Sequence, residues 1–149
     1  MTKRKKRPKD GGPYVGTAVF CDRVLQERDG VLSLIRIVDR FTVPVAPGQE
    51  SAPIQVFAAI MLKAGFIRGQ YKLTIRHRPP SGTVAPDLVI PVLFEGEDRG
   101  VGINAQMNLG GLEEGLHWFD LILEGQRLTS MPLRVIHQPA VLRASTSPA

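Results

Sequence analysis

The three histidines have the widest chemical repertoire of any side chains in this 149-residue sequence. His77, His117 and His137 lie far apart, and none has another histidine or cysteine two or four residues away. Such close pairs are typical of zinc sites, and Cys21, the single cysteine, cannot complete a structural one. We therefore predict no metal site and no cofactor, and we expect three ordinary solvated histidines.

The sequence also offers no activated nucleophile. Cys21 lies in an apolar stretch with no base beside it, which favours a buried, inert thiol. Neither a Gly-x-Ser-x-Gly elbow nor a Gly-rich phosphate-binding loop occurs, and Ser33 and Ser130 are predicted to be ordinary strand residues. These patterns predict a protein that is not an enzyme.

Carboxylates offer two further possibilities. Glu95, Glu97 and Asp98 gather in one loop and could bind calcium, but Arg99 would oppose a cation, so we favour a solvated acidic loop.

Asp39 and Asp120 sit in apolar strand registers, where a buried carboxylate needs a partner. We interpret both as structural ion pairs or turn caps rather than a catalytic dyad. The expected partners are Arg23, Arg36 and Arg40.

The elements that carry these residues alternate apolar and polar side chains with a period of two, which indicates half-buried β-strands. Turn residues separate them. The predicted strands are 15–25, 31–43, 54–63, 70–78, 87–94, 100–109, 116–124 and 126–137. This pattern predicts an all-β antiparallel sandwich of about seven to eight strands, immunoglobulin-like or C2-like.

Turn chemistry and proline add detail to that sandwich. Asp29-Gly30 and Glu124-Gly125 each predict a tight hairpin, the first with a type I′ turn. Pro91 and Pro132 each require an edge or a bulge, since proline donates no ladder bond. The residues expected to be buried are Phe20, Ile35, Ile37, Phe41, Val56, Ile60, Tyr71, Leu73, Ile75, Ile103, Phe119, Leu121, Leu133 and Val135.

The two ends differ in composition from the sandwich, which is expected over 14–137. Residues 1–13 are predicted to form a disordered basic arm and residues 138–149 a flexible tail. The arm explains the whole net charge of +5, because the first ten residues carry six Lys or Arg and one Asp. The residues that could contact a polyanion weakly and without sequence preference are Lys3, Arg4, Lys5, Lys6, Arg7 and Lys9.

Two strands break the alternation in a way that predicts a partner surface. One register of strand 54–63 suffices for the core, which leaves Phe57, Ala59 and Met61 facing outward together with Leu32 and Leu34. Contiguous exposed apolar surface marks an interaction site, here for a protein partner or a second copy. Alternatively, the Pro-rich loop 44–53 or the C-terminal Val141-Leu142 could cover it.

The segments Cys21-Asp22-Arg23-Val24, Asp29–Ile35, Val38–Pro44, Gly115–Gly125 and Met131–Val135 resemble an uncharacterised family of small bacterial β-sandwich proteins. Arg36 departs from that pattern, in which a small residue is usual. The resemblance implies a cytoplasmic bacterial sandwich domain and no specific activity. A single cysteine agrees with a reducing cytosol, and no apolar run is long enough to cross a membrane.

These observations favour a non-catalytic module for protein binding or scaffolding. The alternative is a nucleic-acid-associated protein that uses its basic arm.

Overall fold

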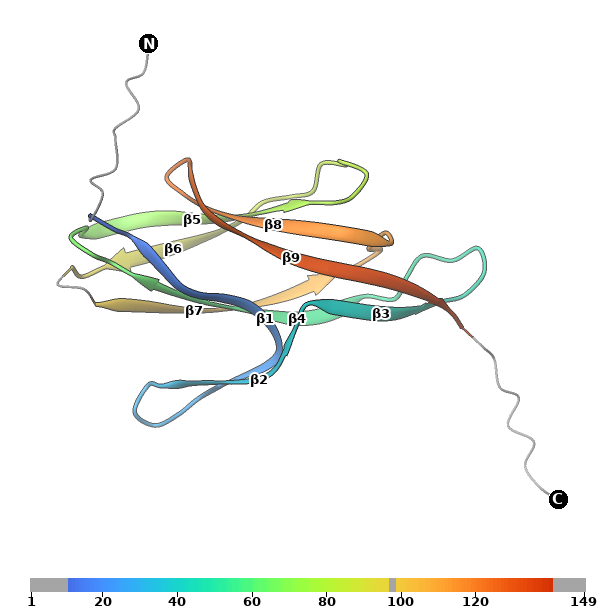
Figure 1. Ribbon diagram of the computed structural model, residues 1–149, viewed down its shortest axis with the longest axis horizontal. Helices are drawn as coiled ribbons and strands as arrows, with labels where there is room; N and C mark the ends of the chain where they lie inside the picture. The colour runs from blue at the N-terminus through green and yellow to red at the C-terminus, as the bar shows by residue number, and fades with distance from the viewer. Residues whose placement is uncertain (1–10, 97–98, 141–149) are drawn as a thin grey trace, which may run out of the picture.

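Nine strands form two sheets that pack face to face in the computed structural model, which describes residues 11–96 and 99–140 (Figure 1). The strands are β1 (Tyr14–Gln26), β2 (Leu32–Val38), β3 (Arg40–Val45), β4 (Ile54–Lys63), β5 (Gly69–Arg78), β6 (Leu88–Phe94), β7 (Gly100–Leu109), β8 (Gly115–Leu123) and β9 (Gln126–Pro139). The described residues contain no helix, and thus none that could span a membrane. The all-β prediction is confirmed.

The two sheets differ in how their strands run. Sheet A has the order β2-β1-β4-β7 and is antiparallel throughout. Sheet B has the order β3-β9-β8-β5-β6, and within it β3 runs parallel to β9. The expectation of a purely antiparallel sandwich is therefore wrong for this one pair. The chain passes directly from sheet A to sheet B between β2 and β3.

The core lies between the sheets and follows the predicted registers. Phe20 of sheet A meets Phe119 of sheet B edge to face, with ring centroids 5.0 Å apart. Most of the predicted core is buried, and Phe41 and Tyr71 are partly buried against it. Ile35 and Ile37 were predicted to be core residues and are 40% and 62% exposed. That prediction is wrong.

The error at Ile35 and Ile37 comes from treating residues 31–43 as one strand. The strand ends at Val38, and Asp39 lies at the crossing between the sheets, where its backbone oxygen accepts a hydrogen bond from Arg134 N at 2.9 Å. A change of sheet resets which face a side chain occupies, so the alternation of β3 does not extend into β2.

Both predicted hairpins form, with different turns. Glu124 and Gly125 have φ values of 46° and 78°, as a type I′ turn requires. At the other hairpin only Gly30 has a positive φ, and Gly30 N bonds Glu27 O at 3.0 Å. The type I′ prediction for Asp29-Gly30 is wrong. The turn runs from Glu27 to Gly30, so Gly30 is its last residue rather than one of its two central residues.

Both prolines lie where a strand has no hydrogen-bonded neighbour on one side. Pro91 lies on β6, the free edge of sheet B. Pro132 lies on β9 before Arg134, where pairing with β3 begins, so that stretch of β9 has a free side.

The sandwich also extends past both predicted boundaries. Gly11 is buried, and β9 continues to Pro139.

Candidate functional site

The β1–β2 hairpin, residues 22–38, is the part of the fold that departs most from a plain sandwich. β1 pairs with β4 from Tyr14 to Cys21, and beyond that point it pairs with β2 alone. Arg36 has a φ of 54° and lies opposite Asp22, whose carboxylate is 3.1 Å from its guanidinium. A left-handed backbone is uncommon for a residue other than glycine, and here it marks the place where the ribbon leaves the sheet.

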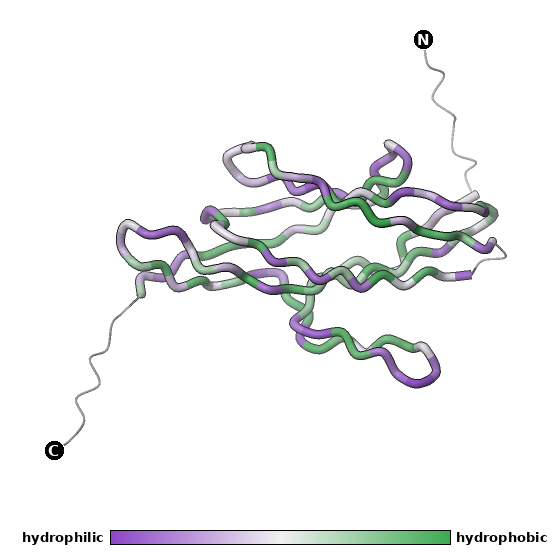
Figure 2. The backbone as a smooth tube through the Cα atoms, turned by 180° about the vertical axis from the view of Figure 1, so that it is seen from behind, coloured by the Kyte–Doolittle hydropathy of each residue, from purple (hydrophilic) through white to green (hydrophobic). Residues whose placement is uncertain are grey.

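From this bend the hairpin folds back across the outer face of sheet A, beneath β4 and β7 in both Figures 1 and 2. A Cβ atom on Gly102 of β7 would lie 3.4 Å from Leu32 Cδ1, although β2 and β7 are at opposite edges of the sheet. Leu32 therefore reaches over the sheet rather than along it. The hairpin supplies a third layer over this face.

That third layer explains the apolar register of β4. Ala59 and Cys21 point away from the core by register, yet Ala59 is 1% exposed and Cys21 is fully buried. Phe57, Leu32 and Leu34 are half-buried, and only Met61 is substantially exposed. The expectation that Ala59 faces outward to a partner is wrong, because the chain's own hairpin packs over its face of the sheet.

The opposite face of the hairpin carries the exposed apolar side chains. Leu25 of β1 and Ile35 and Ile37 of β2 are exposed, and Val31 is exposed at the tip. Figure 2 shows the hairpin strands as largely hydrophobic, with hydrophilic residues at the turn. We call Leu25, Val31, Ile35 and Ile37 the hairpin outer face. It replaces the predicted partner surface as the main exposed apolar patch of sheet A.

The thiol of Cys21 lies under this hairpin. Burial raises its pKa above the ordinary value, so it stays protonated at neutral pH. The predicted burial of this cysteine is confirmed.

A second feature, which the sequence did not predict, is a histidine pair at one end of the sandwich. His77 Nε2 lies 2.8 Å from His117 Nδ1, and His117 Nε2 lies 2.7 Å from the Glu113 carbonyl oxygen. A carbonyl can only accept, so His117 carries its proton on Nε2 and His77 Nε2 donates to His117. His117 is fully buried, and the expectation of solvated histidines is wrong for this pair.

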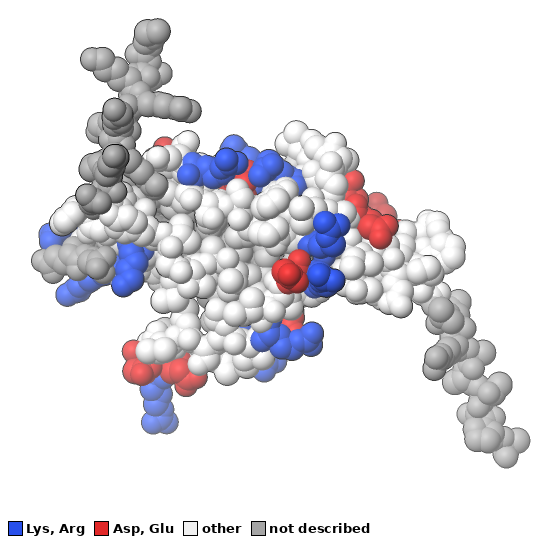
Figure 3. All heavy atoms as spheres, viewed as in Figure 1, with Lys and Arg blue, Asp and Glu red and all other residues white. Residues whose placement is uncertain are grey.

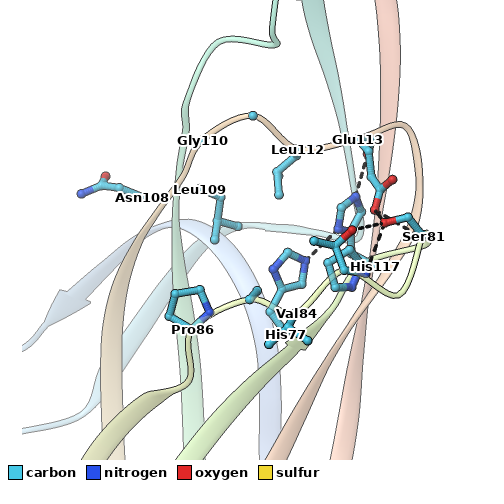
Figure 4. A pocket seen from close by; sticks show the side chains of 14 residues that line it. His77, Ser81, Val84, Pro86, Asn108, Leu109, Gly110, Leu112, Glu113 and His117 are labelled. Atoms are coloured by element: carbon cyan, nitrogen blue, oxygen red, sulfur yellow. Dashed lines mark hydrogen bonds between the residues drawn. The ribbon is translucent and has the colours of Figure 1, made fainter.

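The pair lines a pocket of about 470 Å³ together with Leu109 and Pro86 (Figure 4). His77 stacks on Phe119 with ring centroids 4.4 Å apart. Burial, and then the neighbouring His117, lower the pKa of His77 to about 4, so it is neutral at pH 7.

The pocket contains hydroxyl groups that the imidazoles do not activate. Ser81 Oγ donates to a Glu113 carboxylate oxygen at 2.7 Å and lies 2.7 Å from Thr83 Oγ1. Both imidazole rings are engaged with each other and with Glu113 O. With its proton on Nε2, His77 presents Nδ1 as a hydrogen-bond acceptor, and the described residues hold no group of three metal-ligating side chains.

The two candidate carboxylates, Asp120 and Asp39, differ in burial. Asp120 is buried and receives two hydrogen bonds from Arg78, at 2.6 and 2.9 Å, and one from Ser130 at 2.6 Å. An ion pair was predicted there, but with a different arginine. Asp39 is 81% exposed at the side chain and 3.6 Å from Arg40, so its predicted burial is wrong.

The remaining predicted residues lie in or beside segments that the structure does not describe. Glu97 and Asp98 fall outside the described residues, and Glu95 pairs with Arg99 at 2.9 Å. The predicted polyanion contacts at positions 3–9 and the tail residues 141–149 also lie outside them.

Sequence comparison assigns the chain to a family. A model of DUF6941, a family of unknown function, matches residues 16–136. The chain belongs to this family. The expectation of an uncharacterised domain family is thereby confirmed. No curated protein matches the DUF6941 chain.

A solved structure with a similar fold is the Pseudomonas fluorescens alkylpurine DNA glycosylase AlkC bound to DNA containing an abasic site analog. The TM-score is 0.51 at 10% identity, over 83% of this chain and 30% of that chain. The DUF6941 chain therefore spans less than a third of the glycosylase, and the likeness shows the fold alone.

Sequence reasoning missed the hairpin outer face and the histidine pair of the DUF6941 domain for different reasons. The sequence did contain a signal for the hairpin outer face, because both registers of residues 31–38 contain apolar side chains. The histidine pair had none, since its members are 40 residues apart and only the pairing of β5 with β8 brings them together.

Proposed function

We propose that this domain is a non-catalytic protein-binding module whose hairpin outer face accepts an extended apolar segment of a partner. The observation that carries the proposal is that Ile35 and Ile37 are exposed on β2, the free edge strand of sheet A. An exposed apolar edge can take up another strand, whose backbone pairs with it while its side chains contact the apolar neighbours.

A comparison of the four edge strands singles out β2. β3 and β6 contain Pro44 and Pro91, which block pairing at an edge. β7 lies beside β6 of the other sheet. β2 has the sequence Leu-Ser-Leu-Ile-Arg-Ile-Val, with neither proline nor lysine to discourage a neighbour. We expect pairing along Leu32–Ile35, because the positive φ of Arg36 interrupts a regular ladder beyond it.

The place of the hairpin in the chain supports the same proposal. It is inserted between β1 and β3, where the chain changes sheets, and the sandwich does not need it to close its core. Its inner side chains, Leu32 and Leu34, hold it against sheet A, so its outer face is presented on a supported layer. Insertions carried on a rigid scaffold are where binding functions concentrate.

We further propose the finer class of the fold, immunoglobulin-like rather than C2-like. Strand order supports it, since β1-β4-β7 and β9-β8-β5 correspond to the two sheets of such a sandwich and β3 joins the last strand in parallel. We also keep the cytoplasm as the proposed location, because the single cysteine agrees with a reducing compartment.

Photo-crosslinking in the native host tests the binding proposal. A benzophenone amino acid at position 37 should yield a defined product with a second protein. The same group at Val89, an exposed apolar residue on the Pro91-containing edge, should not. Ile35→Glu should abolish the product while changing the free energy of unfolding by no more than about 0.5 kcal/mol, as surface substitutions do.

Two other outcomes would contradict the proposal as stated. Equal products from positions 37 and 89, or none from either, would remove the hairpin as the binding surface. A product with the mass of two chains, together with a dimer in light scattering that Ile35→Glu dissociates, would replace the foreign partner with a second copy.

A further inference from the structure

The outer face of sheet B carries an excess of positive charge. Its three inner strands, β5, β8 and β9, contain five Lys or Arg and one Asp or Glu. The basic side chains are exposed and alternate with buried residues, which places them on the outer face; they are Lys72, Arg76, Arg78, Arg127 and Arg134. Asp87 and Glu124 beside these strands bring the balance to five cations against three carboxylates, a net charge of +2. Figure 3 shows Lys and Arg side chains gathered along the edge of the molecule that sheet B forms in Figure 1.

Most of these cations have no acidic partner. Arg76 and Arg78 are neutralised by ion pairs with the carboxylates of Asp87 and Asp120. The other three basic side chains of this face form no ion pair with a carboxylate that the structure describes. They are spread over β5 and β9 rather than gathered at one point. Separate cations along a surface match a chain of phosphates better than they match a single anion.

Trp118 lies on the same face, at a hollow of about 570 Å³. It is half-buried and stands opposite Arg78 in the β5–β8 ladder. Arg127 and Ser130 also line the hollow. The Asp120 carboxylate holds two of these side chains in place, because it accepts two hydrogen bonds from Arg78 and one from Ser130. Nη1 of Arg78 takes part in none of these bonds. The hollow therefore places an indole ring beside two guanidinium groups.

We propose that the outer face of sheet B binds single-stranded nucleic acid, with a base stacked on Trp118 and the phosphates neutralised by the basic side chains. Unpaired bases stack on exposed aromatic rings and on guanidinium planes, and four of the five cations here are Arg. An acidic peptide would satisfy the charges but would leave the indole ring without a planar partner. The surface belongs to the sheet opposite the hairpin outer face, so the two proposals can fail independently.

Intrinsic fluorescence tests the proposal, because Trp118 is the only tryptophan and its emission reports on this face. Titrating the full chain with an oligothymidine of roughly 20 nucleotides should quench that emission as a base stacks on the ring. Arg127→Gln should weaken the binding measured in this way. It should also reduce the slope of log affinity against log salt by about 0.7, the value for one phosphate contact with a single strand.

Arg28→Gln is the matched control, since Arg28 is also exposed but lies at the tip of the β1–β2 hairpin, and it should leave affinity and slope unchanged. Equal effects of the two substitutions would overturn the proposal, because binding would then depend on the net charge of the chain. Absence of quenching at low salt would also overturn it, as would equal quenching by a duplex, which offers no free bases. So would quenching by polyglutamate without quenching by oligothymidine, which would establish a surface for an acidic protein instead.

Discussion

The outer faces of the two sheets meet solvent in opposite ways. Along the β5–β8 ladder of sheet B, Arg76, Arg78 and Asp120 lie on the outer face, and Asp87 and Asp120 pair with these arginines, while the exposed apolar residues Val89 and Leu93 lie on the edge strand β6. Sheet A places Phe57 and Ala59 on its outer face and covers them with the β1–β2 hairpin. Apolar residues on the nominally wet face of a strand can therefore indicate a further layer from the same chain rather than a partner.

The largest effect should come from charging the covered face. Ala59→Glu places a carboxylate beneath the hairpin at a position that is 1% exposed, and an unpaired buried charge should lower the free energy of unfolding by about 3–5 kcal/mol. Thr74→Glu is the matched change on the outer face of sheet B, where it would lie near Lys72 and Arg76, and should cost no more than about 0.5 kcal/mol. Urea unfolding measures both.

Limited trypsin digestion adds a local readout to that pair of variants. If Ala59→Glu displaces the hairpin, cleavage after Arg28 at its tip should accelerate. Equal losses of stability in the two variants, with unchanged cleavage, would mean that the hairpin does not protect this face.

The second comparison concerns how the free energy of unfolding depends on pH. His77 of sheet B should make the protein less stable in acid, whereas the hairpin should make no such contribution. The pKa of His77 is lowered to about 4, so the unfolded chain binds a proton more readily between pH 6.5 and 4. The free energy of unfolding should therefore fall as the pH drops through that range, by at most about 3 kcal/mol because solvent screens the half-buried ring, and His77 should add no further loss below it. His77→Gln should remove most of this fall, whereas Ile37→Gln on the hairpin should leave it in place.

Denaturant melts at pH 7 and pH 4 give these values directly. A His77→Gln protein that loses as much stability in acid as the parent would show that the histidine pair does not account for the acid dependence.

The smallest of the three effects concerns the ion pair on sheet B. Asp120→Asn removes the charge that Arg78 and Ser130 contact and should cost about 1–3 kcal/mol at pH 7. Hydrogen bonds, above all from Arg78, hold the Asp120 pKa below its usual value. The stability that the ionised Asp120 contributes is fully present above pH 3.8, and it is lost as the pH falls through the lower pKa of Asp120 in the folded protein. Asp39→Asn, at an exposed carboxylate, should have almost no effect.

The alternation of the strands was sufficient to predict most of the core. Leu73, Ile75 and Phe119 are buried because side chains on one strand alternate between faces whatever the strand packs against. The hairpin at Glu124-Gly125 and the edge position of Pro91 were equally predictable, since backbone conformation and the missing N–H group act within a few residues. The short apolar stretch that ends at Cys21 likewise sufficed to predict its burial.

Contacts between distant segments needed the tertiary structure. Asp120 was expected to pair with Arg23, Arg36 or Arg40, but the β5–β8 ladder places Arg78 beside it instead. The same ladder joins His77 to His117.

The covered face of sheet A shows the limit most clearly. Sequence alone indicated that Leu32, Leu34, Phe57, Ala59 and Met61 are too apolar for a wet surface. Only the bend at Arg36 and the change of sheet at Asp39 decided that these residues belong to two layers of one chain. Periodicity specifies the face of a strand on which a side chain lies, whereas the element that covers that face depends on where the rest of the chain folds.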